Sequence, residues 1–139
     1  MSTLIGAINA SASALDAQRA RMEVAVSNMA NAESTRGADG QPYRRREVVL
    51  ATKDHDAMSG HIEAAGVEVA AVVEDQAPFR RRFEPSHPDA DADGFVAVPN
   101  VDVPEEMVDM LGAARAYQAN LTAIGLIRDT VQKALELGK

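Results

Sequence analysis

Apolar residues recur every seven positions at both ends of this chain. The N-terminal end carries two such series, Ile8, Leu15, Met22 and Met29, and, between them, Ile5, Ala12, Arg19 and Val26, in which only Arg19 breaks the apolar pattern. The C-terminal end also carries two series, Val103, Met110, Tyr117, Ile124 and Val131, and Met107, Ala114, Leu121, Arg128 and Leu135. Spacings that alternate between three and four residues place side chains along one narrow stripe of an α-helix. The repeat therefore predicts two long helices that pair through their stripes.

Start and stop signals bound the C-terminal helix. Asp102 and Glu105 form a pair that resembles a capping box, and Pro104 falls in the first turn. Gly138 follows the last apolar residue of the repeat, where helices commonly end. The sequence thus divides into an N-terminal helix within residues 1–36, a middle region at 37–99 and a C-terminal helix within 100–139.

Further apolar residues lie off the predicted stripes, and they are Leu4, Val24, Leu111, Leu126, Ile127 and Leu137. A two-helix hairpin covers one stripe of each helix, so these residues would stay exposed in an isolated chain. Aromatic residues make up only 4% of the sequence, which leaves little bulk for a core of its own. Both observations indicate that helices from other chains complete the packing.

The middle region reads as short strands and turns. It carries a net charge of −5 out of −7 for the whole chain, together with five of the six prolines. Residues rich in β-branched side chains predict strands at Arg46–Ala51, Val67–Val73 and Phe95–Val98, and residues 53–61 read as a mobile loop. The predicted fold class is α+β and mainly α, with two long terminal helices in an antiparallel coiled-coil-like pair and a small β-rich middle region.

A proline, an aromatic residue and three arginines occur together twice, at 42–46 and at 78–82. The two segments are candidates for neighbouring strands of one small sheet. Because the surrounding region is acidic, the arginines are expected to pair with acidic loops, within the chain or between chains, rather than to bind nucleic acid.

The sequence contains only weak indications of metal binding or catalysis. Asp89–Gly94 matches the first half of a calcium loop, but Asn100 stands where a bidentate Glu is needed, so an acidic turn is the preferred interpretation. His55, His61 and His87 lack the spacing of ligands on one helical face. No nucleophile–base set or phosphate-binding glycine loop is present in the sequence. We expect no enzyme activity, cofactor or metal.

Other classes are excluded by composition. The chain has no Cys, which rules out disulfides and thiolate metal sites. It has no apolar stretch long enough for a membrane span, and its first residues lack the pattern of a cleaved signal peptide. Taken alone, these patterns predict a cytoplasmic protein.

Two segments carry a more specific resemblance. Ser27-Asn28-Met29-Ala30-Asn31, followed by Thr35, resembles a signature of the flagellar axial proteins, which include rod, hook and hook-associated subunits. The second segment runs from His87 to Asn120 and is similar to the FlgC-type proximal rod proteins within that family. The family-motif positions in this sequence are Ser27, Asn28, Asn31, Thr35, Pro99, Asn100, Glu106, Met107, Tyr117 and Gln118.

The resemblance implies a structural, non-enzymatic subunit of the proximal rod in the flagellar basal body. It implies export by the flagellar type III apparatus without a cleaved signal, and hence a place in the rod that spans the periplasm. The implied partners are other copies of the chain, other rod proteins and the export apparatus. Helical assembly would proceed through the terminal helices, with an interface that includes Ile8, Leu15, Met22, Met29, Val103, Met107, Met110, Tyr117, Leu121 and Ile124.

Two other functions remain open from the residues alone. A soluble helical adaptor or chaperone could use the same stripes to bind a partner helix in a discrete complex. A calcium-regulated module would instead depend on the acidic turn at residues 89–94.

Overall fold

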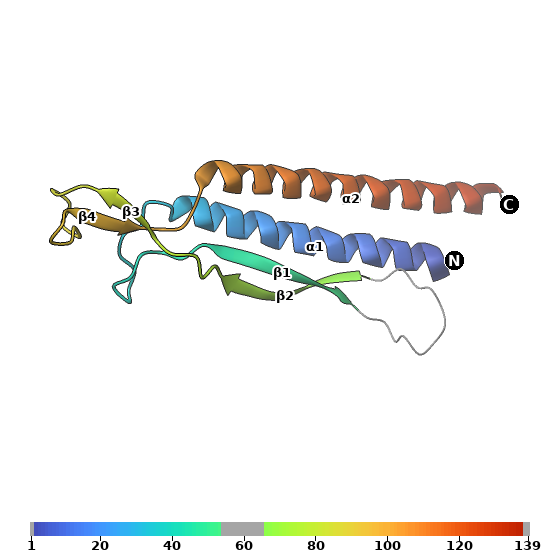
Figure 1. Cartoon of the computed structure of the whole chain (residues 1–139). Coiled ribbons are helices and arrows are strands. Elements are labelled where there is room, and N and C mark those ends of the chain that lie inside the picture. Colours follow the sequence, from blue (N-terminus) through green and yellow to red (C-terminus); the bar gives the residue numbers. More distant parts are fainter. Residues whose placement is uncertain (1, 54–65, 138–139) are drawn as a thin grey trace.

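The molecule is an elongated stack of a helix, a second helix and a two-stranded ribbon (Figure 1). The computed structural model describes residues 2–53 and 66–137. Helix α1 spans Ser2–Ala30 and helix α2 spans Val103–Leu137, and the two run antiparallel. They confirm the predicted pair of long terminal helices with small sheets between them in sequence.

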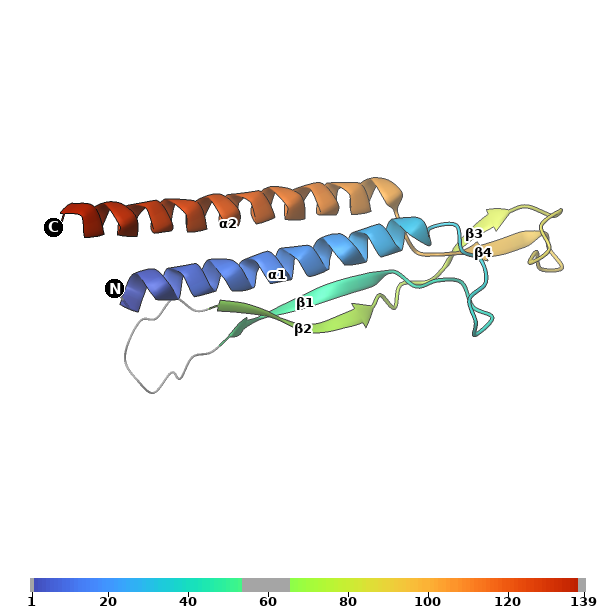
Figure 2. The same ribbon diagram turned by 180° about the vertical axis from the view of Figure 1, so that it is seen from behind.

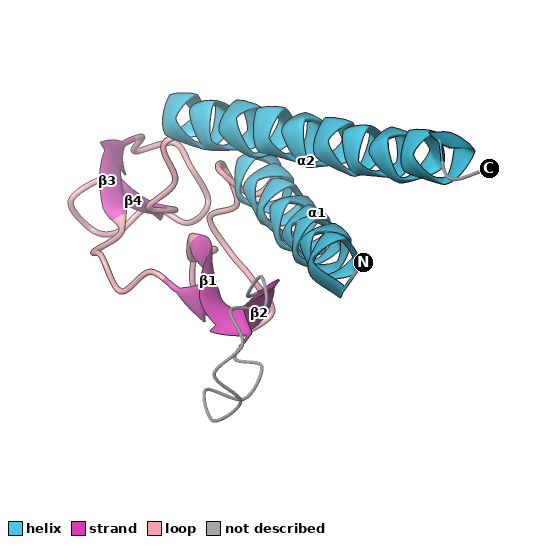
Figure 3. Ribbon diagram, turned by 90° about the vertical axis from the view of Figure 1, so that its right-hand side faces the viewer, coloured by secondary structure: helices cyan, strands magenta, loops and turns pink. Residues whose placement is uncertain are grey.

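Helix α1 is the central layer. It packs against α2 on one side and against strands β1 (Arg46–Lys53) and β2 (Gly66–Glu74) on another, as the end-on view in Figure 3 shows. Within the described part of the chain, α1 is the one helix or strand that α2 contacts. The buried side of α2 is therefore the side that faces α1.

Each sheet has two antiparallel strands. β1 pairs with β2, with Arg46 opposite Glu74 and Lys53 opposite Gly66, and a bulge lies between Val49 and Leu50. β3 (Arg80–Phe83) pairs with β4 (Phe95–Val98) at the far end of the molecule, beyond the end of α1 (Figure 2).

The expectation that the two arginine-rich segments neighbour each other in one sheet is wrong. Arg44 and Arg45 precede β1, whereas Arg80–Arg82 belong to β3, and the two strands lie in different sheets. Each strand instead pairs with the valine-rich strand that follows it in the sequence. The predicted loop at 53–61 falls almost entirely outside the described residues, as do His55, His61 and Gly138.

The start of α2 follows the capping signals in the sequence. The carboxylate of Asp102 accepts a hydrogen bond from the backbone N–H of Glu105 at 3.3 Å, and Glu105 and Glu106 place acidic side chains in the first turn. Both features favour the helix start, because they satisfy a free backbone donor and complement the positive end of the helix dipole.

The heptad pattern predicts one stripe on each helix, but the structure assigns the two series of each helix to different faces. On α2, the face toward α1 holds Met110, Tyr117, Ile124 and Val131, which are half-buried, whereas Val103 of the same series is exposed at the start of the helix. The second series is exposed, including Met107 at 49% and Leu121 at 42%. The other residues of the inner face are Glu106, Ala113, Asn120 and Ile127. Because the first three are polar or small, the sequence does not show this series as an apolar stripe.

Helix α1 shows the same division. The series of Ile8, Leu15, Met22 and Met29 is half-buried, whereas Ile5, Ala12, Arg19 and Val26 lie on a strip that faces solvent. We define the α1 strip as those four exposed residues. We define the α2 flank as Val103, Met107, Leu111 and Leu121. Since successive residues turn by about 100° around a helix, the α2 flank lies roughly a quarter turn from the face that packs on α1.

The fully buried apolar side chains are all small. They are Ala17, Ala25, Ala32, Val96, Val98, Val101 and Ala113. Alanines at the centre of the helix pair let the two helices approach closely, but each one buries little area. The thin core that the low aromatic content predicts is present within the described residues.

The ribbon is attached to α1 at a point of close approach. The Oγ of Ser13 accepts a hydrogen bond from the backbone N–H of Val67 at 3.0 Å and donates one to the carbonyl of Ala10 at 2.8 Å. A Cβ added to Gly66 would lie 2.9 Å from that Oγ. Glycine at position 66 therefore allows β2 to reach α1.

We expect Gly66→Ala to destabilise the subunit by about 1–3 kcal/mol, because the new methyl group would push β2 away from Ser13. Gly112→Ala is the matched control, since a Cβ there would meet nothing within 4 Å. That change should stabilise the exposed helix by about 1 kcal/mol. Urea unfolding followed by circular dichroism measures both effects, and a stable Gly66→Ala variant would contradict the close approach.

Candidate functional site

The two family-motif segments meet at one buried polar cluster. Asn28 comes from the last turns of α1, Glu106 from the first turns of α2, and Tyr43, Arg45 and Arg46 from the chain that enters β1. We call this cluster the polar junction. Asn28 is fully buried and Glu106 is 2% exposed, so the junction lies inside the molecule where an unpaired polar group is costly.

Asn28 uses all of its hydrogen-bonding capacity. Its Nδ2 donates to the carbonyl oxygen of Arg46 and to the Oε2 of Glu106, both at 2.9 Å. Its Oδ1 accepts from the backbone N–H of Arg46 and from the hydroxyl of Tyr43, both at 3.0 Å. One side chain thus joins α1, β1 and α2, and leaves no amide atom unsatisfied.

Glu106 is neutralised by Arg45. The Nε of Arg45 lies 2.5 Å from the Oε1 of Glu106, while Asn28 binds the other carboxylate oxygen. Both oxygens therefore have donors, as a carboxylate buried to this degree requires. The pairing of opposite charges and the two hydrogen bonds together allow a charged residue to occupy the inner face of α2.

Further carboxylates surround the guanidinium of Arg45. Glu47 is bound directly, and oxygens of Asp109 and Asp75 lie 3.6 and 3.9 Å away. Burial alone lowers the pKa of Arg45, but the hydrogen bonds with Glu47 and Glu106 outweigh it and raise that pKa above its usual range. Arg45 therefore remains charged at any pH at which the fold exists.

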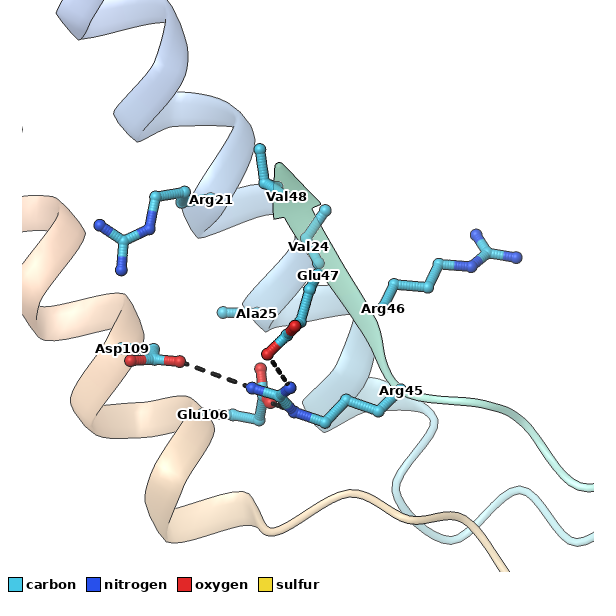
Figure 4. Close-up of a pocket in the computed structure, with 9 residues that line it drawn as sticks. All are labelled: Arg21, Val24, Ala25, Arg45, Arg46, Glu47, Val48, Glu106 and Asp109. Carbon is cyan, nitrogen blue, oxygen red and sulfur yellow. Dashed lines mark hydrogen bonds and ion pairs between the residues drawn. The ribbon is translucent and has the colours of Figure 1, made fainter. Parts of the chain in front are cut away.

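A shallow groove lies over the junction. Figure 4 shows the guanidinium of Arg45 between Glu106 and Asp109 of α2 and Glu47 of β1, whereas the side chain of Arg46 points away. Val24, Ala25 and Val48 provide apolar walls. Glu47, Glu106 and Asp109 gather around Arg45 in this groove. Arg21, which also lines the groove, bonds Gln18 at 3.3 Å.

Asn100 ties the segment before α2 to the same place. Its Oδ1 accepts from the backbone N–H of Arg45 at 3.0 Å, and its Nδ2 lies 3.4 Å from the carbonyl oxygen of Asp75. Pro99 and Val101 on either side are buried. The family-motif residue Asn100 thus joins the entry to α2 with the strand ends of the ribbon.

The remaining family-motif residues have local or exposed roles. Asn31 donates to the carbonyl of Ser27 at 2.9 Å and closes the end of α1, while the Ser27 hydroxyl lies 3.4 Å from that of Tyr43. Thr35 donates to Asp89 at 3.0 Å. Met107 and Gln118 are exposed on α2, and Tyr117 is half-buried against α1. The structure therefore brings together Ser27, Asn28, Asn100 and Glu106, but not the other motif residues.

Sequence patterns did not single out Tyr43 or the specific role of Arg45. Tyr43 is one of two tyrosines in the chain, and its hydroxyl finds a buried partner, which is the usual arrangement for this side chain. Arg45 appeared only as the middle member of an arginine run. Glu106 could have indicated such a partner, because a Glu that is buried on the inner face of a helix needs a cationic side chain beside it.

Most arginines of the two segments pair with acidic residues within the chain, whereas Arg44 and Arg80 donate to backbone carbonyls. In addition to Arg45, Arg81 binds Asp91 at 2.7 Å and Arg82 binds Glu33 at 2.6 Å. In the acidic turn, Asp91 also accepts from the backbone N–H groups of Asp93 and Phe95, and Asp89 accepts from Thr35 and Arg36. Across residues 2–53 and 66–137, no three potential ligands gather into a metal site.

Several large apolar side chains of the described residues are exposed, and on the helices they include Ile5, Val26, Met107, Leu111 and Leu121. Much of the exposed apolar area belongs to the helices, on the α1 strip and the α2 flank, and Val108 and Leu126 add to it on another side of α2. Neither helix in the described residues has the length and apolar character to cross a membrane.

The chain is similar to known flagellar rod proteins over nearly its whole length. Residues 92–137 match the family described as "Flagellar basal body rod FlgEFG protein C-terminal". The flagellar basal-body rod protein FlgC of Salmonella typhimurium is 46% identical over 136 residues, which cover 98% of both chains. The FlgC proteins of Bacillus subtilis and Aquifex aeolicus are 43% and 35% identical, over 99% and 100% of both chains.

We expect Asn28→Ala to destabilise the subunit by about 2–4 kcal/mol, because it removes four hydrogen bonds and leaves Glu106 short of a buried donor. Asn31→Ala is the matched control at the same helix end. Asn31 bonds only its own helix among the described residues, so its loss should cost less than about 1 kcal/mol. Equal shifts of the urea midpoint for the two variants would contradict the role of Asn28.

The acidic turn should contribute a pH-dependent stability. The backbone N–H of Phe95 binds the carboxylate of Asp91, and with help from Arg81 it lowers the pKa of Asp91 below its usual value of 3.8. The contribution is therefore present above about pH 4 and is lost as the pH falls through the lowered pKa. Urea midpoints measured between pH 5 and pH 2 should fall less steeply for Asp91→Asn than for the native chain, and parallel curves would refute the assignment.

Proposed function

This chain belongs to the family of the flagellar basal-body rod protein FlgC, and we propose that it assembles helically through the exposed faces of its terminal helices. It is a structural subunit of the proximal rod and not an enzyme. The proposed partners are other copies of the chain and other rod proteins. The observation that carries the proposal is the exposed apolar surface of α1 and α2.

The helix faces are suited to contacts on more than one side. The α2 flank lies about a quarter turn from the face that packs on α1, so a neighbouring helix can pack there without displacing α1. Contacts that repeat without closing on themselves generate a helical tube.

The proposed interface divides the predicted residues into two groups. Val103, Met107 and Leu121 lie on the α2 flank and would contact a neighbour directly. The half-buried residues would pack within the helix pair and be completed at their edges by a neighbour, and they are Ile8, Leu15, Met22, Met29, Met110, Tyr117 and Ile124.

We further propose export by the flagellar type III apparatus without a cleaved signal. A thin core of alanine and valine favours this route, because unfolding the chain for passage through a narrow channel disrupts little buried area. The absence of cysteine also removes one means of covalent trapping. In the assembled rod, tightly packed helices would transmit torque and surround the export channel.

Leu121→Asp should prevent rod assembly and motility, because it places a charge on the α2 flank. Leu121 is half-exposed in the subunit, so the purified variant should keep its helical circular dichroism and still be exported. Ala119→Asp is the comparison, since residue 119 is also exposed and lies on nearly the opposite side of α2, beside Val108 and Leu126. Loss of assembly in Leu121→Asp but not in Ala119→Asp would assign the contact to the α2 flank.

Motility assays and electron microscopy of basal bodies measure the outcome. Normal motility of the Leu121→Asp strain would remove the α2 flank from the assembly mechanism. A discrete complex with a partner protein by light scattering, with no incorporation into a rod, would instead favour the adaptor function.

A further inference from the structure

One side-chain hydrogen bond joins the two helices directly. Within residues 2–53 and 66–137, the bond from Asn28 to Glu106 is the one that links α1 to α2, and no ion pair in that part of the chain connects them. The ribbon, in contrast, is bound to α1 at two places, through Ser13 and through Asn28. This bond is thus the one directional side-chain contact within the helix pair itself, and Arg45 and Asn100 tie the start of α2 to the chain that enters β1.

The rest of the helix interface does not define a position along the axis. Apolar and small residues line it, and their attraction is non-directional. The inner face of α2 repeats every seven residues, with Met110, Tyr117 and Ile124 in equivalent places. A shift of one heptad, about 10 Å along the axis, would bring large apolar residues of this series to equivalent places again.

The connection between the helices, residues 31–102, is too long to fix their offset by its length, as a short loop would. Its last residues do bind the rest of the chain, because Asn100 accepts a hydrogen bond from the backbone N–H of Arg45 and Val101 is buried, so they belong to the same junction. After a shift of one heptad, Asn28 would face Ala113 in one direction, or Glu106 would face Arg21 in the other. In both cases Asn28 would lose Glu106, and a buried polar group would be left without its partner.

We propose that the polar junction sets the register between α1 and α2. Asn28 and Glu106 select one offset out of several that the apolar interface tolerates, with Arg45 and Asn100 holding Glu106 and the entry to α2 in place. Buried polar groups specify register in this way in coiled coils, at a cost in stability. The residues act as positioning residues, because the register fixes where the α1 strip lies relative to the α2 flank.

Double electron–electron resonance, which measures the distance between two spin labels, tests this proposal in the full-length subunit. The chain has no native cysteine that would react with a spin label. Labels can therefore be placed at two introduced cysteines, Glu23→Cys and Leu126→Cys, and both positions are exposed. In the observed register these positions are offset by about 22 Å along the axis. A shift of one heptad would change that offset by about 10 Å, which the measurement resolves.

The test variant carries Asn28→Leu and Glu106→Leu. The labelled native chain should give one narrow distance peak, whereas this variant should give a second peak in at least about a tenth of the molecules. The control carries Asn31→Leu and Asn120→Leu, which replace amides that bond only within their own helices. It should keep the single native peak, which separates loss of register from a general effect of added leucines.

Two results would overturn the proposal. One is a single unchanged peak in the Asn28→Leu and Glu106→Leu variant with cooperative unfolding intact. The other is a native chain that already shows two peaks. If the double variant lacks cooperative unfolding, Asn28→Ala serves in its place, because it removes the link to Glu106 and leaves the Arg45 pair; a single native peak there would equally refute the role of the junction.

Discussion

The hydrogen bond between Asn28 and Glu106, with Arg45 neutralising the carboxylate, is the contact on which the subunit depends. It lies where the end of α1, the start of β1 and the start of α2 converge. Away from this cluster, a side-chain hydrogen bond links the ribbon to α1 at Ser13, and the buried apolar residues are alanines and valines. In a fold with so little buried apolar area, a fully satisfied polar cluster defines the arrangement that the apolar contacts then reinforce.

The small core and the exposed apolar helix faces have one cause, which is that the large apolar side chains lie on the outside of the helix pair. Large apolar residues such as Met107, Leu111 and Leu121 lie outside, while Ala113 lies between the helices. A monomeric protein would reverse this distribution, because burying large side chains contributes most to stability. In the proposed assembly, neighbouring subunits would supply that contribution. The acidic region is paired largely within the chain, through Arg45, Arg81 and Arg82, so it does not compete for these faces.

The sequence predicts the helices and strands well, but it predicts less well which face of each helix is buried. The seven-residue period and the cap at Asp102 identify both helices, and β-branched runs identify three of the four strands. Periodicity does not say which stripe faces which partner, so Met107 and Leu121 were grouped with Met110 and Tyr117. The junction contains two motif residues, Asn28 and Glu106, but they lie 78 positions apart. A single sequence contains no local signal for a contact at that separation, because it depends on how the whole chain folds back.

The antiparallel arrangement of α1 and α2 has a practical consequence for labelling. Both helix ends nearest the chain termini lie at the same end of an elongated body, and β3 and β4 lie at the other (Figure 1). A fluorescent or affinity tag at either terminus would therefore crowd the same neighbour. The turn at Gly37–Gly40 is exposed, and Gly40 has a φ of 79°. An insertion there would leave both helix faces uncovered, which makes this turn the better place from which to observe the subunit inside a growing rod.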